Sequence, residues 1–389
     1  MSIEENYSIG FVAALALREK QIQQVYRPII AVHKWFARRP GTLFRGLILS
    51  EFAQVPVQQS YYQSHGLEGI TVADCFMGGG SPLLEANRVG CNVIGTDINP
   101  MATWIVREEI DALDMAAYEA ASVQLLGHLQ TTLGHLYKTK CPISGRVDAD
   151  LKYGLWVKVG SCGNCARDYD LFQGYLIADD TRHTAYVIAC HSCGDLHEVS
   201  DPKQLGTCHC GAVLRTEGNV KRSKAVCSHC GHVNSAPFRS DGPPRHRLFA
   251  MEYYNADLKN RPGRCFKKPD ADDLARVAEA EAELSKLKVE FVPDDAIPGG
   301  DETDRLLRWG YRRFNEVFNG RQLLALETTA RWISKVTDLR IKRALATNFS
   351  DLIRYQNMLC RYDTMALKSL DIFSIHGFPA SYVQCESNF

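Results

Sequence analysis

Residues 71–100, TVADCFMGGGSPLLEANRVGCNVIGTDINP, decide the expected fold of the N-terminal part of the chain. Short apolar runs at 70–74 and 91–96 predict two strands, and residues 81–89 between them have the spacing of a helix. Three consecutive glycines separate the first strand from the helix, and Asp97 closes the second strand. This order is typical of a nucleotide-type cofactor site in a doubly wound α/β fold.

The glycine turn indicates which cofactor is expected. Gly78 and Gly80 would let the backbone approach a ligand where a Cβ atom would clash. Asp97 could accept hydrogen bonds from both hydroxyls of a ribose. Asp74, at the end of the first strand, would repel the pyrophosphate of NAD but attract the amino and sulfonium groups of S-adenosylmethionine (SAM). We therefore expect SAM; the plainer alternative is an α/β core with a glycine-rich turn.

The composition sets wide limits on function. The chain has 389 residues, enough for two or three domains, and its 45 basic residues equal its 45 acidic ones, so only local patches could attract nucleic acid. The N-terminus does not resemble a signal peptide, and no apolar run has the length of a membrane span. We expect a cytoplasmic protein without membrane contact, whose 14 cysteines do not form disulfides.

Composition also predicts three parts. Residues 1–138 read as α/β, with a long helical pattern at 115–137. Residues 139–240 hold nine of the 14 cysteines and many Gly, Lys and His. Residues 241–389 predict helices at 270–290, 320–338 and 350–362. Arginines at about helical spacing could form a basic ridge there, or an ordinary solvated helix face; they are Arg305, Arg308, Arg312, Arg313 and Arg321.

The cysteine-rich part predicts a metal-stapled module. Four close pairs of cysteines can each present two thiolates, and two pairs make one tetrahedral zinc site that has no open position for catalysis. We expect two structural zinc ions; the simplest pairing is sequential, 162/165 with 190/193 and 208/210 with 227/230. Cys141 looks like half of another knuckle, but Ser144 stands at its partner position, which leaves the pairing open. The expected ligands are Cys162, Cys165, Cys190, Cys193, Cys208, Cys210, Cys227 and Cys230.

Longer stretches carry a family resemblance. DCFMGGGSPLLEANRVGCNVIGTDINPMA resembles motifs I and II of DNA amino-methyltransferases, and HKWFARRPGTLFRGLILSEF at 33–52 is similar to the opening block of adenine-specific DNA methylases that contain a zinc ribbon. Residues 300–329 and 351–379 are also similar to that group. The resemblance implies a Rossmann-like SAM-dependent methyltransferase core, an inserted zinc-ribbon module and a helical C-terminal part. It also implies methylation of adenine N6 in DNA, in a restriction-modification or related system.

The upstream block and the basic residues complete the expected sites. Trp35 could pack against the adenine of the cofactor, and Arg38 and Arg39 could meet phosphate; alternatively they are a core aromatic and a solvated face. Beyond the last knuckle, Arg245 and Arg247 could contact DNA phosphates, as could Lys221, Arg222 and Lys224. The expected cofactor-binding residues are Asp74, Phe76, Gly78, Gly80, Asp97, Asn99 and Trp35.

The catalytic motif of the resembled family is missing. Such enzymes hold the flipped base with a short Asp/Asn/Ser-Pro-Pro-aromatic motif, but the only Pro-Pro of the chain, at 243–244, has neither the acid nor the aromatic. No catalytic residue is therefore assigned. We expect part of a truncated or split enzyme, with a second polypeptide supplying the motif. The alternative is a catalytically inactive, zinc-dependent nucleic-acid-binding subunit; methylation of RNA or a small molecule is a third reading.

Overall fold

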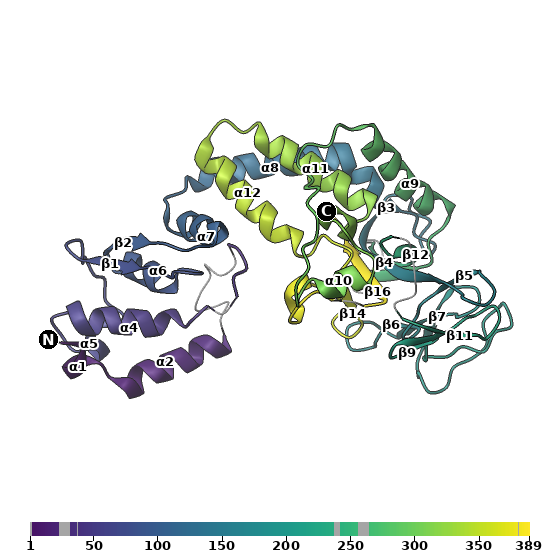
Figure 1. Ribbon diagram of the computed structural model, residues 1–389, viewed down its shortest axis with the longest axis horizontal. Coiled ribbons are helices and arrows are strands. Elements are labelled where there is room, and N and C mark those ends of the chain that lie inside the picture. Colours follow the sequence, from purple (N-terminus) through teal and green to yellow (C-terminus); the bar gives the residue numbers. More distant parts are fainter. Residues whose placement is uncertain (1, 23–31, 37, 237–241, 256–263, 380) are drawn as a thin grey trace. The chain divides into compact units, whose positions relative to one another are not determined.

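The computed structural model describes residues 2–22, 32–36, 38–236, 242–255, 264–379 and 381–389 (Figure 1). Backbone contacts divide the chain into a first unit, residues 1–122 with 336–351, and a second unit, residues 123–335 with 352–389. Helices and several sheets are present, so the expected mixed α/β class is confirmed. The division differs from the three parts expected from composition, because strands from the second and third parts pair in one sheet.

The first unit contains the expected strand-turn-helix-strand order. Strand β1 (Thr71–Asp74) lies parallel to β2 (Asn92–Gly95), and α6 (Ser81–Arg88) connects them. The register places Asp74 opposite Gly95, so both strands end at the same edge. The remaining helices are α1 (Ile3–Asn6), α2 (Ile9–Gln21), α4 (Gly41–Phe52), α5 (Val57–Ser60), α7 (Pro100–Ile110), the start of α8 (Met115–Leu133) and most of α12 (Leu339–Ile353).

Only one face of the β1–β2 sheet is covered within the described residues. Val72 and Val93 on that face pack against buried side chains of α4, α6 and α7, which include Leu49 and Leu83. The opposite face is exposed and consists of Thr71, Ala73, Asn92 and Ile94. Parallel sheets are normally covered on both faces, so this face is available to a further layer of protein.

The second unit is built around an antiparallel sheet. In the described part of the chain this sheet has six strands in the order β13-β12-β4-β16, with β3 and β5 also paired to β4. The strands are β3 (Lys138–Thr139), β4 (Ala149–Ser161), β5 (Asp168–Asp170), β12 (Arg245–Tyr254), β13 (Arg264–Lys267) and β16 (Val383–Ser387). Since three of them come from residues 241–389, the expected helical C-terminal part is helical only in part.

Helices cover one face of this sheet. α9 (Ala271–Lys286) and α11 (Gly320–Ser334) pack there, where Leu324 of α11 shares a cluster with Leu151 and Trp156 of β4. The helix predicted at 350–362 is wrong: α12 ends at Ile353, and a turn leads into strand β14. The other elements are α10 (Asp304–Arg308), β14 (Arg361–Asp363), β15 (Lys368–Leu370) and the 3-10 turns η2 (Gly134–Tyr137), η3 (Phe314–Val317) and η4 (Ile372–Ser374).

The cysteine-rich segment packs on the other face. Leu155 and Val157 of β4 share a cluster with Phe172 and Ile188 from this segment. Its strands form small antiparallel sheets and are β6 (Leu176–Ala178), β7 (Tyr186–Ala189), β8 (Leu196–Val199), β9 (Val220–Lys221), β10 (Lys224–Val226) and β11 (Val233–Ser235). Among the described residues, no helix combines the length and the apolarity that crossing a membrane requires.

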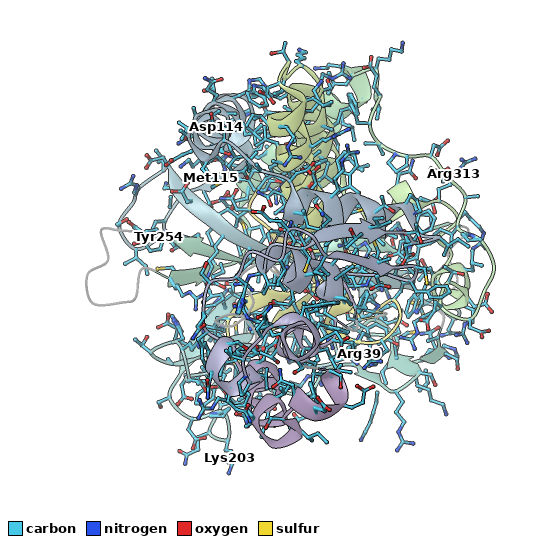
Figure 2. All side chains as sticks on the ribbon, turned by 90° about the vertical axis from the view of Figure 1, so that its left-hand side faces the viewer. Arg39, Asp114, Met115, Lys203, Tyr254 and Arg313 are labelled. Carbon is cyan, nitrogen blue, oxygen red and sulfur yellow. The ribbon has the colours of Figure 1, made fainter. Side chains whose placement is uncertain are left out.

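The predicted basic ridge is wrong, because its arginines serve different structures. Arg321 lies in the core, and Arg312 and Arg313 lie outside the helices. Arg313 is exposed (Figure 2). Its side chain pairs with Asp294 at 2.9 Å. Arg305 donates to the carbonyl oxygen of Phe378 at 3.1 Å. These contacts give the arginines no common face.

A buried ion pair connects α11 to the sheet. The Arg321 guanidinium donates two hydrogen bonds to the Glu386 carboxylate, Nε to Oε1 at 2.7 Å and Nη2 to Oε2 at 2.8 Å. Trp156 Nε1 also donates to Glu386 Oε2 at 2.7 Å, and Arg321 Nη1 donates to the Leu136 carbonyl at 2.9 Å. Both charged side chains are almost fully buried, so their stability depends on these partners.

Replacing Glu386→Gln should destabilise the protein by about 3 kcal/mol or more, because it leaves the Arg321 charge buried without a counter-charge. Urea unfolding measures the change. The control is Asp150→Asn, which removes the partially exposed pair with Lys138 and should cost less than about 1 kcal/mol. A Glu386→Gln variant as stable as the wild type would contradict the prediction.

Candidate functional site

The glycine turn between β1 and α6 has a backbone that favours glycine. Gly78 and Gly80 have positive φ angles of 48° and 70°, a region that L side chains rarely adopt. A Cβ atom on Gly80 would also lie 2.5 Å from Cγ2 of Val106 on α7. The turn can therefore keep its path close to α7 only with glycine at this position.

Asp97 connects the end of β2 to this turn. Its carboxylate accepts from the backbone N–H of Gly78 at 2.8 Å through one oxygen and from that of Asn99 at 2.8 Å through the other. The hydrogen bonds from Asn99 and Gly78 lower the pKa of Asp97 below its usual value. Each carboxylate oxygen has a further lone pair, so Asp97 can still accept hydrogen bonds from a ligand.

The other residues predicted at the turn lie beside it. Asp74 Oδ1 accepts from the backbone N–H of Phe76 at 3.1 Å, and the Phe76 side chain is 88% exposed. Asn99 caps α7 by accepting from the N–H of Met101 at 2.9 Å. The turn thus presents two carboxylates and an exposed aromatic ring at the carboxyl ends of two parallel strands.

Trp35 lies against the turn itself. Its Nε1 is 3.2 Å from the position of a Cβ atom on Gly78, and its Cδ1 is 2.7 Å from that position on Gly79. The indole therefore fills the space that the missing side chains leave. The structure brings Trp35 to the predicted site, but the group it contacts there is the backbone of the turn.

Arg38 has a structural role that sequence analysis missed. Its Nη1 donates to the Gly79 carbonyl at 2.9 Å, and its guanidinium pairs with Glu109 of α7 at 2.5 Å. Both side chains are nearly buried, so the Arg38 charge is matched within its own chain, and contact of Arg38 with phosphate stays a prediction. Arg39 is exposed (Figure 2). No sequence signal identified Glu109, which lies on α7, 71 residues after Arg38 in the chain.

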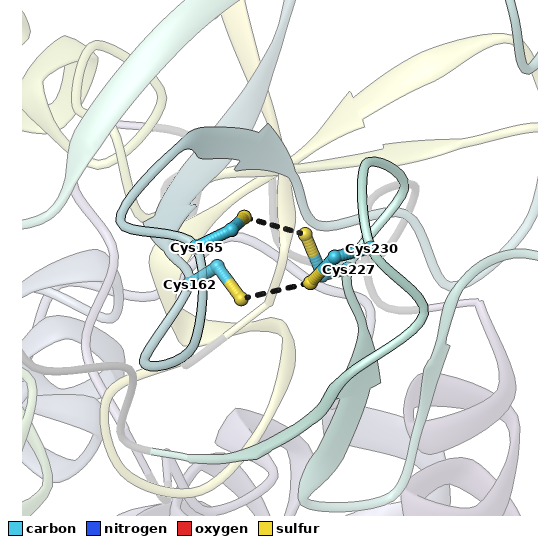
Figure 3. A group of neighbouring side chains, drawn as sticks. All are labelled: Cys162, Cys165, Cys227 and Cys230. Carbon is cyan, nitrogen blue, oxygen red and sulfur yellow. Dashed lines mark hydrogen bonds between the residues drawn. The ribbon is translucent and has the colours of Figure 1, made fainter.

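The eight predicted cysteines gather into two groups of four within the described residues. Figure 3 shows the first group, in which Cys162 Sγ lies 3.6 Å from Cys230 Sγ and Cys165 Sγ lies 3.8 Å from Cys227 Sγ. Four thiolates at about 2.3 Å from a tetrahedral zinc would be about 3.8 Å apart. The spacing therefore fits one zinc ion.

The second group has the same spacing. Cys190 Sγ lies 3.7 Å from Cys210 Sγ, and Cys193 Sγ lies 3.5 Å from Cys208 Sγ. Each group of four could hold a zinc ion. The sequential pairing is therefore wrong: residues 162/165 meet 227/230, and residues 190/193 meet 208/210, so the second group is nested inside the first. The spacing of the cysteines in the sequence does not encode this pairing.

Backbone hydrogen bonds favour the thiolate at Cys162, whereas burial raises the pKa of Cys227 to about 11. In the first knuckle the Cys162 N–H donates to the Arg167 carbonyl at 3.0 Å, and the Asn164 N–H approaches Cys162 Sγ at 3.4 Å. Hydrogen bonds from the backbone of Cys165 and Asn164 lower the pKa of the Cys162 thiol to about 6, against the effect of burial. Thiolates are the form that binds zinc.

Cys141 forms a knuckle without a second cysteine. Its N–H donates to the Arg146 carbonyl at 2.7 Å, and Gly145 has a φ of 74°, which repeats the backbone of the metal knuckles. Its Sγ accepts from the Tyr253 hydroxyl at 3.3 Å and from the Ser144 N–H at 3.5 Å. Hydrogen bonds thus surround this thiol, and it belongs to neither group of four among the described residues.

Two imidazole rings approach a ligand sulfur of the second group. His197 Nε2 lies 3.2 Å from Cys208 Sγ, and His209 Nδ1 lies 3.6 Å from the same sulfur. His209 Nε2 also faces Asp195 at 3.2 Å. Four cysteines already complete a tetrahedral set, so these imidazoles are not needed as ligands. They lie beside the expected ligand Cys208.

The basic residues near the ribbons fall into two classes. Arg245 pairs with Asp168 at 2.7 Å, which lowers the pKa of that carboxyl to about 2, and Arg247 pairs with Asp170. These two candidates for DNA contact are therefore matched by carboxylates of their own chain. The exposed side chains at the β9–β10 turn make no ion pair among the described residues; they are Lys221, Arg222 and Lys224.

Comparisons with family models, curated proteins and solved structures found no match to this chain. The glycine turn and the cysteine groups are therefore the features of the molecule that indicate a function.

The nested pairing predicts the zinc content of a double variant. Changing Cys165→Ser and Cys227→Ser removes ligands from one group only, so the purified protein should keep one zinc per chain where the wild type binds two. Elemental analysis by mass spectrometry measures the ratio. Loss of both zinc ions would support the sequential pairing instead. The control is Cys75→Ser, at an exposed cysteine outside the groups, which should keep both.

Proposed function

We propose that this chain is the cofactor-binding and zinc-ribbon part of a SAM-dependent DNA methyltransferase that modifies adenine N6. The observation that carries the proposal is the pair Asp74 and Asp97, which flank a glycine turn at the carboxyl ends of adjacent parallel strands. In open α/β folds this edge is where cofactors bind, and the proposal takes the β1–α6–β2 element as part of a Rossmann-like core.

The residues at the turn fit SAM. The carboxylates offer acceptors for the ribose hydroxyls at Asp97 and a negative charge near the amino and sulfonium groups at Asp74. Phe76, with its exposed ring, could cover the adenine. SAM would supply an electrophilic methyl group when bound. The chain's own residues hold and orient it, since Arg38 and Trp35 keep the turn in place.

The exposed face of the β1–β2 sheet supports a second polypeptide. Ile94 on this face is 58% exposed, and its neighbours Ala73 and Thr71 are also exposed. A parallel sheet that is covered on one face only needs a further layer. We propose that a partner polypeptide supplies that layer together with the Pro-Pro-aromatic motif that holds the target base.

The ribbon tip supports contact with DNA. Lys221, Arg222 and Lys224 place three exposed cations on one short turn of the module, and such a cluster attracts phosphate without reading sequence. The same observation favours a second candidate function, a catalytically inactive zinc-dependent nucleic-acid-binding subunit. The two differ in whether SAM binds.

Calorimetry with SAM tests the proposal. The zinc-loaded chain should bind SAM, and Asp97→Asn should weaken binding about tenfold or more, because hydrogen bonds to a charged acceptor contribute about 1.5–3 kcal/mol. Asn keeps one oxygen that can accept from the Gly78 N–H and loses the acceptor of the Asn99 N–H, so circular dichroism checks that the variant is folded. Glu68→Gln, an exposed change in the same unit, is the control.

A folded, zinc-loaded chain that does not bind SAM would refute the methyltransferase proposal. The subunit alternative predicts DNA binding that falls steeply with salt and is unaffected by SAM or by Asp97→Asn. Replacing Lys221, Arg222 and Lys224 by Ala should then reduce that binding, which fluorescence anisotropy with a labelled duplex would measure.

A further inference from the structure

Helices α8, α9 and α11 of the second unit enclose a cleft of about 430 Å³ that contains neither the glycine turn nor the cysteine groups. Its volume lies in the range of small-molecule sites, about 300–1,000 Å³. Leu133 and Leu324 form a buried apolar floor, and Leu287 on its wall is 41% exposed. An apolar floor that opens to solvent can take a ligand with one flat apolar part.

Trp332 supplies an aromatic wall. It lies on α11, one turn after Thr328, and both residues line the cleft with a partly exposed surface. An indole beside an apolar floor is a stacking platform, because every nucleobase has a flat face that can lie on it. The cleft is therefore suited to a planar ring.

The charges at the rim are mostly positive. Lys286 at the end of α9 and Lys335 directly after α11 are exposed, line the cleft and make no ion pair among the described residues. Arg331 is different, since it pairs with Glu327 at 2.5 Å and Glu290 at 3.6 Å. The two lysines are thus the cations available to a ligand.

One carboxylate lines the same cleft. Glu283 lies one turn before Lys286 on α9 and forms no ion pair within the described part of the chain. The Glu283 carboxylate would repel a ligand that places its own carboxylate on the apolar floor. It would accept a hydrogen bond from a ligand with an exocyclic amine. A ligand that matches the cleft carries an anion, a flat ring and an amine.

We propose that this cleft binds a nucleoside phosphate, with its base on Trp332, its amine on Glu283 and its phosphate on Lys286 and Lys335. The inference deepens the proposed function, on which it rests, by naming a contact for a nucleic-acid strand. The same chemistry is present in a free nucleotide and in one residue of a single strand. Adenine and cytosine carry the required amine, and thymine does not.

The test uses the full zinc-loaded chain and fluorescein-labelled oligonucleotides (dA)8 and (dT)8, with unlabelled dAMP as competitor. Trp332→Leu should weaken (dA)8 binding about tenfold or more, whereas Trp332→Phe should retain most of it. Lys286→Ala with Lys335→Ala should reduce the salt slope by about 1.4, since each phosphate contact on a single strand contributes about 0.7. Glu283→Gln should reduce the preference for (dA)8 over (dT)8.

Lys203→Ala is the matched control, because Lys203 is an exposed lysine of the cysteine-rich segment (Figure 2); this variant should bind (dA)8 as the wild type does. Circular dichroism and zinc content confirm that each variant is folded. Unlabelled dAMP is compared with unlabelled (dA)8 at equal concentrations of nucleotide. If dAMP displaces the labelled probe as well as (dA)8 does, the ligand is a free nucleotide. If only the oligonucleotide displaces it, the ligand is a strand.

Binding of neither probe would overturn the proposal. It would equally be overturned if the folded Trp332→Leu and double lysine variants bound (dA)8 as tightly as the wild type, since other cations would then account for binding. SAM calorimetry on the same samples separates the two ideas: the cleft variants should bind SAM normally, and Asp97→Asn should bind (dA)8 normally. The two measurements therefore distinguish a wrong proposal for the cleft from a wrong proposal for SAM binding at the glycine turn.

Discussion

The backbone ladder between β4 and its neighbours β12 and β16 is the constraint on which the second unit depends. β4 pairs with β12 along most of its length and with β16 along its central part. Both of these neighbours of β4 come from the region after the cysteine-rich segment. The chain must therefore leave this sheet, form the ribbons and return. β4 itself leads directly into the knuckle at Cys162, which makes the metal group a continuation of the sheet.

The nested cysteine groups follow from this return of the chain. Residues 162/165 and 227/230 lie at the two ends of the excursion, and joining them closes a loop that contains the second group. The first group lies within a buried cluster in which Cys162 and Cys227 pack beside Tyr169, Leu171 and Val220. Metal binding there would add to the stability that this apolar packing provides.

The first unit shows preorganisation of a different kind. Arg38, Trp35 and Asp97 each contact the glycine turn, so its backbone amides and carbonyls are already held before any ligand arrives. Preorganised groups bind without the cost of ordering themselves. The uncovered face of the β1–β2 sheet gives the same unit a surface for another layer of protein, beside the edge where a cofactor would lie.

The sequence by itself determined those features that depend on residues close together in the chain. The strand-turn-helix-strand order around Gly78, the helices α9 and α11 and the eight cysteines with metal-binding spacing were all predictable, because each rests on short periodicities or close pairs. The tertiary structure decided what depends on distant residues: the nested cysteine pairing, the burial of Arg321 against Glu386, and the use of Arg38 and Arg245 by carboxylates of the same chain. The sequence does not show whether an arginine such as Arg38 contacts a phosphate or a carboxylate such as that of Glu109. Its partner depends on how separate elements pack together.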